Sequence, residues 1–177
     1  KDAYRKQAWC ELLQGDTMSY LRLLSEVETN GFSVVGIDKE AQKEAESGLI
    51  PNLHLLRGRL LFDGGYYDQS YAQLESLDEE NLSYENMLEK KYRQARIGQQ
   101  TRRHEQAKKD FLITIQLGRN SDDYFAANSA LMLGRMYEEE GDFESAKSMY
   151  RLCLDLDFTT YRNSIRGKAK QRLSQLE

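Results

Sequence analysis

The stretch Ala127–Leu156, ANSALMLGRMYEEEGDFESAKSMYRLCLDL, carries the strongest structural signal in the chain. Apolar residues recur at helical spacing on both sides of Gly141-Asp142, which predicts two short amphipathic helices joined by a tight turn. Gly134 in the first helix and Ala146 in the second let the two backbones approach closely, and the ring of Tyr150 fills the gap towards neighbouring helices. Such a pair cannot bury its apolar face alone, so it predicts further copies stacked against it.

The same pattern recurs twice upstream. One copy places Gly58 before a Gly64-Gly65 turn, and the other places Ala95 before an Arg102-Arg103 turn. The equivalent small residues Gly58, Ala95 and Gly134 are therefore 37 and 39 positions apart. The residues that we expect to pack the hairpins together are Gly58, Ala95, Gly134, Ala107, Phe111, Tyr137, Ala146 and Tyr150.

These features resemble the tetratricopeptide repeat family over residues 49–157, in which a helical hairpin of about 34 residues is repeated. The longer spacing in this chain falls in two polar, turn-like segments, Asp78–Leu82 and Gly118–Asp123. The middle copy departs from the family pattern, because Gly98 stands where the first helix usually has a tyrosine. The resemblance implies an all-α fold, a right-handed superhelical α-solenoid of helical hairpins with a C-terminal capping helix.

The expected organisation is one continuous domain. Residues 1–48 predict a degenerate hairpin, Tyr4–Gln14 and Thr17–Glu28, followed by an extra helix that Asp38 would cap and Gly48 would end. Residues 49–157 predict three repeats, at about 51–78, 83–117 and 124–157. Residues 161–177 predict a final capping helix with an apolar stripe and basic outer faces, as a solenoid needs at its end.

Composition and motifs indicate neither a catalytic site nor a cofactor. The net charge of −4 gives no basic footprint for nucleic acid, and no apolar run approaches the roughly 20 residues of a membrane span. Cys10 and Cys153 lie far apart in sequence, and neither His54 nor His104 has partners at metal-ligand spacing. The carboxylates of Glu138–Glu144 lack the ligand spacing of a calcium loop. We therefore predict no catalytic residue, no metal and no cofactor.

The chain begins with Lys1 rather than Met, which suggests a fragment or a processed product. A cytoplasmic location is favoured, and export to the periplasm stays open. We expect a monomer, with self-association through an exposed end of the solenoid, near Trp9, as an alternative.

The candidate binding site is the concave face of the predicted solenoid. The resemblance implies that the first helix of each repeat lines this face, and Arg59, Arg96 and Arg135 each follow the small residue of their repeat. Three guanidinium groups in a column would bind carboxylates, whereas the alternative is that they pair with acids of the chain and only solvate the groove. The full predicted groove comprises Leu55, Arg59, Phe62, Tyr92, Arg93, Arg96, Asn128, Leu131, Arg135 and Glu138.

Two functions are compatible with this sequence. The first is a non-catalytic scaffold that binds a protein or peptide segment in the arginine-lined groove, with an acidic segment as one option. The second is the C-terminal helical-repeat domain of a larger enzyme or regulator whose active part lies outside this chain. In the family, a clamp of lysines and asparagines binds the C-terminal carboxylate of heat-shock chaperones, but Leu55 and Met132 occupy clamp positions here. That particular ligand is therefore not expected.

Overall fold

The computed structural model describes residues 1–177 as ten α-helices and two short 3-10 helices without any strand, which confirms the all-α prediction. The chain forms two compact units, residues 1–53 and residues 54–177. The division follows Leu53, near the boundary after residue 48 that the sequence suggested. Each unit is described by itself.

The first unit contains three helices, α1 (Asp2–Leu13), α2 (Thr17–Thr29) and α3 (Gly36–Ser47). Helices α2 and α3 each pack against α1 and against each other. Their buried residues come from apolar faces of all three helices: Ala8, Trp9, Leu12, Tyr20, Leu23, Leu24, Val27, Ala41 and Ala45. The carboxylate of Glu44 accepts hydrogen bonds from Trp9 Nε1 at 2.7 Å and from Tyr20 Oη at 3.3 Å, and so joins the three helices.

The prediction that Asp38 caps the third helix is wrong. Helix α3 begins at Gly36, and its capping residue is Val35, three residues before Asp38. Asp38 is used differently, because its Oδ1 accepts a hydrogen bond from the backbone N–H of Asp2 at 3.3 Å. The expected stop at Gly48 is present, with the left-handed backbone (φ +61°) that ends many helices.

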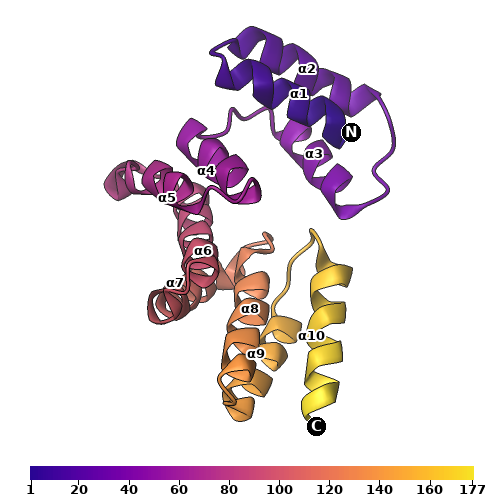
Figure 1. Ribbon diagram of the computed structural model, residues 1–177. Coiled ribbons are helices and arrows are strands. Elements are labelled where there is room, and N and C mark those ends of the chain that lie inside the picture. Colours follow the sequence, from indigo (N-terminus) through magenta and orange to yellow (C-terminus); the bar gives the residue numbers. More distant parts are fainter. The chain divides into compact units, whose positions relative to one another are not determined.

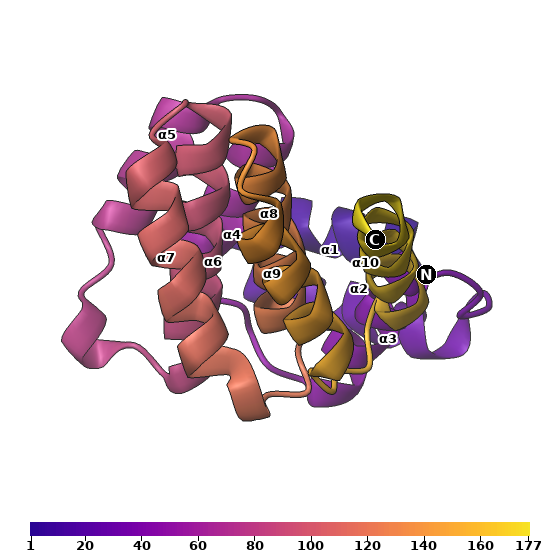
Figure 2. The same ribbon diagram turned by 90° about the horizontal axis from the view of Figure 1, so that it is seen from below.

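The second unit is a row of antiparallel helices in chain order (Figure 1). Helices α6, α7, α8 and α9 pack side by side, and α10 lies against α9 and α8, which Figure 2 shows from below. This arrangement confirms the predicted helical-repeat fold. The elements are α4 (Leu53–Asp63), α5 (Tyr67–Glu75), η1 (Glu79–Asn81), α6 (Tyr84–Gln100), α7 (His104–Leu117), η2 (Gly118–Asn120), α8 (Phe125–Glu139), α9 (Phe143–Asp155) and α10 (Arg162–Leu176).

Small residues create the close contacts within the hairpins. A Cβ added to Gly134 on α8 would lie 2.6 Å from Cε1 of Tyr150 on α9, so the ring occupies the space that a side chain would need. At Gly58 the corresponding neighbour is Leu74 Cδ2 at 2.9 Å, and Ser70 Oγ donates to the Gly58 carbonyl at 2.6 Å. In each case the hairpin depends on the absence of a side chain.

Gly98 plays the same role between α6 and α7. An added Cβ at this position would lie 3.1 Å from the Cβ of Ala107, which is fully buried. The residue that replaces the usual tyrosine therefore marks a close helix–helix contact. A large ring, such as that of Tyr137 at the equivalent position of the third repeat, has no room beside Ala107.

One apolar core runs through most of the second unit. Ala95, Ala107, Phe111, Ala146 and Tyr150 are all fully buried in it. Ile165 and Ala169 on α10 belong to the same core, so α10 covers the end of the row of helices. A smaller cluster of Leu55, Leu74, Leu77 and Ile97 holds α4 and α5 to α6.

Candidate functional site

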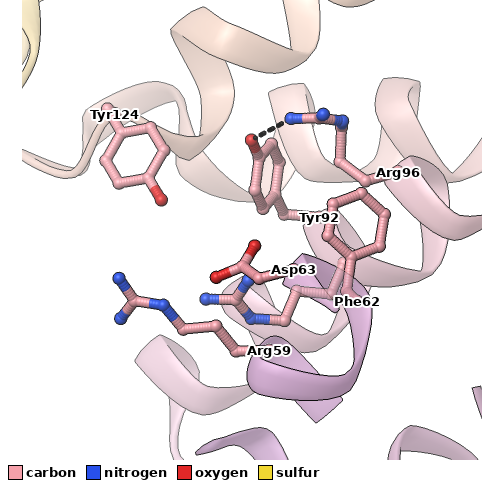
Figure 3. Close-up of a pocket in the computed structure, with 7 residues that line it drawn as sticks. Arg59, Phe62, Asp63, Tyr92, Arg96 and Tyr124 are labelled. Carbon is pink, nitrogen blue, oxygen red and sulfur yellow. Dashed lines mark hydrogen bonds between the residues drawn. The ribbon is translucent and has the colours of Figure 1, made fainter. Parts of the chain in front are cut away.

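A cavity of about 190 Å³ lies in the second unit between α4, α6 and the start of α8 (Figure 3). Helices α4 and α6 supply six of its seven lining residues, and the residue immediately before α8 supplies the seventh. The lining residues are Arg59, Phe62 and Asp63 from α4, Tyr92, Arg93 and Arg96 from α6, and Tyr124 immediately before α8. Five of the ten predicted groove residues are therefore brought together here.

Tyr92 organises the inner wall of the cavity. Its side chain is buried, and its Oη accepts hydrogen bonds from Arg96 Nη1 at 3.1 Å and from Asn128 Nδ2 at 2.6 Å. Its ring packs against Phe125, with ring centroids 5.0 Å apart. Asn128 thus contributes by holding Tyr92 in place, since it is not among the residues that line the cavity.

Arg93 is already neutralised by its own helix. Its Nε donates to Glu89 Oε1 at 2.7 Å, and its Nη2 contacts the same oxygen. Burial would lower the pKa of Arg93, but the Glu89 carboxylate outweighs this effect and holds the pKa above its ordinary value. The pair is a structural ion pair on one wall, because a buried guanidinium requires such a partner.

Arg96 is the guanidinium without a carboxylate. Its charged group lies over the ring of Phe62, 5.3 Å from the centroid, and its one hydrogen bond is to Tyr92. Its Nε is buried and has no hydrogen-bond partner. A planar cation stacked on an aromatic ring and left with spare donors is well suited to bind an anionic group.

Tyr124 and Asp63 complete the opening of the cavity. The Tyr124 ring packs edge-on against Tyr92 and Tyr161, at 5.9 Å and 5.1 Å between centroids. Burial raises the pKa of Tyr124, so its hydroxyl is a protonated donor at neutral pH. Figure 3 shows this hydroxyl and the Asp63 carboxylate directed towards the cavity. Asp63 itself is exposed.

The other predicted groove residues lie elsewhere. Leu55 and Leu131 are 2% and 1% exposed and belong to the apolar cores, so placing them on the binding surface was wrong. Glu138 is already hydrogen-bonded within the protein, because it accepts hydrogen bonds from Tyr150 Oη at 2.6 Å and from Arg172 Nη1 at 3.0 Å.

Arg135 is half-buried and does not line the cavity. Of the three arginines expected to form a column, Arg59 and Arg96 line the cavity and Arg135 does not. Sequence reasoning did not select Asp63 or Tyr124 as groove residues. Their positions in the sequence could have indicated these two residues, since Asp63 follows Phe62 at the end of α4 and Tyr124 directly precedes α8.

Comparison with protein families identifies one matching stretch. A family model described as a tetratricopeptide repeat matches residues 127–160, which contain α8 and α9. Searches of curated proteins and of solved structures gave no match. None of the helices combines the length and apolar character that crossing a membrane requires.

Proposed function

We propose that this chain, whose residues 127–160 match a tetratricopeptide repeat model, is a non-catalytic scaffold that binds an acidic segment of a partner protein in the cavity between α4, α6 and α8. Stacked helical repeats of this kind suggest a protein-binding role in general. The chemical character of the partner is inferred from the lining of the cavity.

The observation that carries this proposal is the state of Arg96. Its guanidinium is half-buried, stacked on Phe62 and without a carboxylate partner, and its Nε has no hydrogen bond. The terminal nitrogens of the Arg96 guanidinium could donate two parallel hydrogen bonds to a carboxylate that entered the cavity.

The neighbouring groups are also suited to binding. Tyr124 offers a hydroxyl that stays protonated, and the rings of Phe62 and Tyr92 offer apolar walls for the stem of an acidic side chain. Three arginines and Tyr124 supply hydrogen-bond donors to the lining, and Asp63 is its one carboxylate, so the preferred guest is an acceptor. Aromatic and arginine side chains together are also typical of the residues that dominate protein interfaces.

Selection from a library of displayed random dodecapeptides tests the proposal. We expect the wild-type protein to enrich peptides that place Asp or Glu beside an apolar residue. Arg96→Glu should weaken the binding of these peptides at least about tenfold, because it replaces the attraction by repulsion. Isothermal titration calorimetry with the enriched peptides measures the change.

Arg119→Glu is the matched control, since Arg119 is exposed on η2 and does not line the cavity. It makes the same change of charge and should leave peptide affinity within about twofold of wild type. Circular dichroism must show equal helicity for both variants. Enriched peptides without acidic residues, or an Arg96→Glu protein that binds them as tightly as wild type, would contradict the proposal.

A further inference from the structure

We infer that Tyr161, the residue before α10, is a positioning residue for the cavity, because its ring keeps Tyr124 in the orientation that directs the Tyr124 hydroxyl towards a guest. The consequence for binding rests on the proposed function, since it concerns how the same cavity is kept ready for its guest. The orientation of Tyr124 can be measured without any guest, so the inference and the proposed function can fail separately.

The Tyr124 side chain is held by neighbouring rings and not by hydrogen bonds. Its hydroxyl has no hydrogen-bond partner within the protein, and Figure 3 shows it directed towards the cavity. Its ring packs edge-on against Tyr92 and Tyr161, with centroids 5.9 Å and 5.1 Å away, and is tilted against Phe125 at 4.7 Å. Of these three rings, only that of Tyr161 comes from a segment outside α6 and α8. Tyr161 thus supplies a contact that the helices of the cavity do not.

An unusual backbone conformation sets the direction of the Tyr161 side chain. Tyr161 has φ +59° and ψ +12°, in the left-handed region that is rare and unfavourable for a bulky residue. Arg102, the other residue of this kind, lies in a hairpin turn, whereas Tyr161 begins a helix. Strained conformations persist where the surrounding contacts fix them, and they are frequent at functional sites. The strain at Tyr161 therefore indicates a side chain whose direction matters.

The segment that carries Tyr161 is fastened to the loop that carries Tyr124. Figure 1 shows the connection from α9 to α10 returning to the end of the row at which α8 begins. The backbone N–H of Thr159 donates to the carbonyl of Asp122 at 3.1 Å, two residues before Tyr124. Phe158 is only 1% exposed, so the segment is also packed into the protein. The ring of Tyr161 therefore reaches Tyr124 from a fixed support.

Loss of the Tyr161 ring should lower the fraction of molecules in which Tyr124 faces the cavity. A side chain at the end of a loop gains access to other staggered rotamers when one of its ring contacts is removed. The apparent Kd then rises by the inverse of the fraction that is competent to bind. One aromatic pair corresponds to a factor of about three to ten in such an equilibrium, so we expect a loss of affinity of that size.

Two substitutions separate the ring from the backbone. Tyr161→Asn removes the ring, and the start of α10 should be kept because asparagine adopts the left-handed conformation more readily than most residues. Tyr161→Phe is the matched control, since it retains the ring. Circular dichroism should show equal helicity for both variants and the wild type. If Tyr161→Asn does not fold, Tyr161→Gly replaces it, because glycine takes this conformation without strain.

Nuclear magnetic resonance measures both the orientation of Tyr124 and the affinity of the cavity. Three-bond couplings of the Tyr124 Cγ to the backbone N and C′ give its rotamer populations in the free protein. We expect one rotamer above about nine-tenths in wild type and Tyr161→Phe, and a fall to about one third or less in Tyr161→Asn. The binding probe is N-acetyl-glutamate methylamide, followed by the Nε–H signal of Arg96, which is assigned by its loss in Arg96→Lys. Its Kd should be about three- to tenfold higher in Tyr161→Asn and unchanged in Tyr161→Phe.

The results distinguish the inference from the proposed function. A single Tyr124 rotamer in Tyr161→Asn overturns the positioning role of Tyr161, whatever the affinity of the cavity. An averaged Tyr124 with an unchanged Kd also overturns the inference, since its orientation would not matter to binding, and leaves the anion site intact. If the probe does not shift the wild-type Arg96 signal, the proposed anion site is wrong, and the rotamer of Tyr124 alone decides whether Tyr161 positions it.

Discussion

The turns between paired helices in the second unit share one backbone geometry, and Arg102 is the one residue other than glycine at its left-handed position. Gly65, Arg102 and Gly141 occupy equivalent positions with φ of +81°, +60° and +82°. In each turn the next residue's N–H bonds to the carbonyl five residues earlier, for example Arg103 to Gly98 at 2.8 Å and Asp142 to Tyr137 at 2.9 Å. Arg102 adopts the left-handed conformation that usually falls to glycine, at a cost of about 1–2 kcal/mol.

Replacing this arginine by glycine should stabilise the protein. Arg102→Gly relieves the backbone strain of the folded protein. Glycine also increases the conformational entropy of the unfolded chain, which offsets part of this stabilisation. We therefore expect a net increase of about 0.5–1 kcal/mol in the free energy of unfolding. Urea unfolding followed by circular dichroism measures it. The reverse change, Gly141→Ala, should destabilise by a similar or larger amount. A loss of stability in Arg102→Gly would mean that the Arg102 side chain makes a favourable contribution of its own.

At the scale of elements, the junction between α5 and the following hairpin is unusually polar. Lys90 donates to the Leu77 carbonyl at 3.1 Å and pairs with Glu79 at 3.0 Å, and Gln94 donates to Glu75 at 2.6 Å. Asp110 on α7 is only 7% exposed and accepts a hydrogen bond from Gln106 Nε2 at 3.0 Å. Burial raises the pKa of Asp110, and the nearby carboxylates raise it further. This junction therefore contains an acid whose ionised form is disfavoured.

The sign of the pH effect follows from this raised pKa. The unfolded chain ionises Asp110 near its ordinary pKa of 3.8, whereas the folded protein holds the proton to higher pH. The free energy of unfolding of the wild type should fall as the pH rises from 3.8 through the pKa of Asp110 in the folded protein. Above that pKa, the contribution of Asp110 should stay constant. Asp110→Asn keeps the Oδ1 acceptor for Gln106 without the charge.

We therefore expect Asp110→Asn to be more stable than wild type at pH 7 and equal to it near pH 3.5. Thermal unfolding at several pH values measures the difference in melting temperature. Asp155→Asn, at an exposed position on α9, should match wild type throughout. A variant that is less stable than wild type at pH 7 would show that attraction by Lys91 outweighs the burial of the carboxylate.

At the scale of the whole molecule, the sequence was sufficient for the fold but only partly for the cavity. Gly134 and Tyr150 predicted the hairpin because the small and large residues that interlock are visible as a spacing. Leu55 and Leu131 were misplaced because a helical pattern does not say which of two neighbouring faces a leucine covers. Tyr124 escaped notice because it reaches the cavity from the end of a loop, and only the packing of α4, α6 and α8 brings it there.

The second unit should also be unevenly stable along its length. The large apolar core extends from Ala95 on α6 to Ala169 on α10, whereas α4 and α5 depend on the small cluster around Leu55 and Leu74. Helix α5 is short, from Tyr67 to Glu75, and its first turn has no side-chain cap. Because local opening is easiest where few apolar contacts must be broken, the amides of α5 should exchange with solvent at least about ten times faster than those of α9.

Hydrogen exchange followed by mass spectrometry checks this gradient, and the same experiment bears on the cavity. Helix α4 supplies Arg59, Phe62 and Asp63 to the lining, so an anion that bridges α4 and α6 must hold the weaker hairpin in place. An enriched acidic peptide should therefore slow exchange in α4 and α5 and leave α9 unchanged. Uniform protection of α5 and α9 in the free protein would instead mean that the unit opens as one cooperative block. Binding would then have no weak hairpin to stabilise.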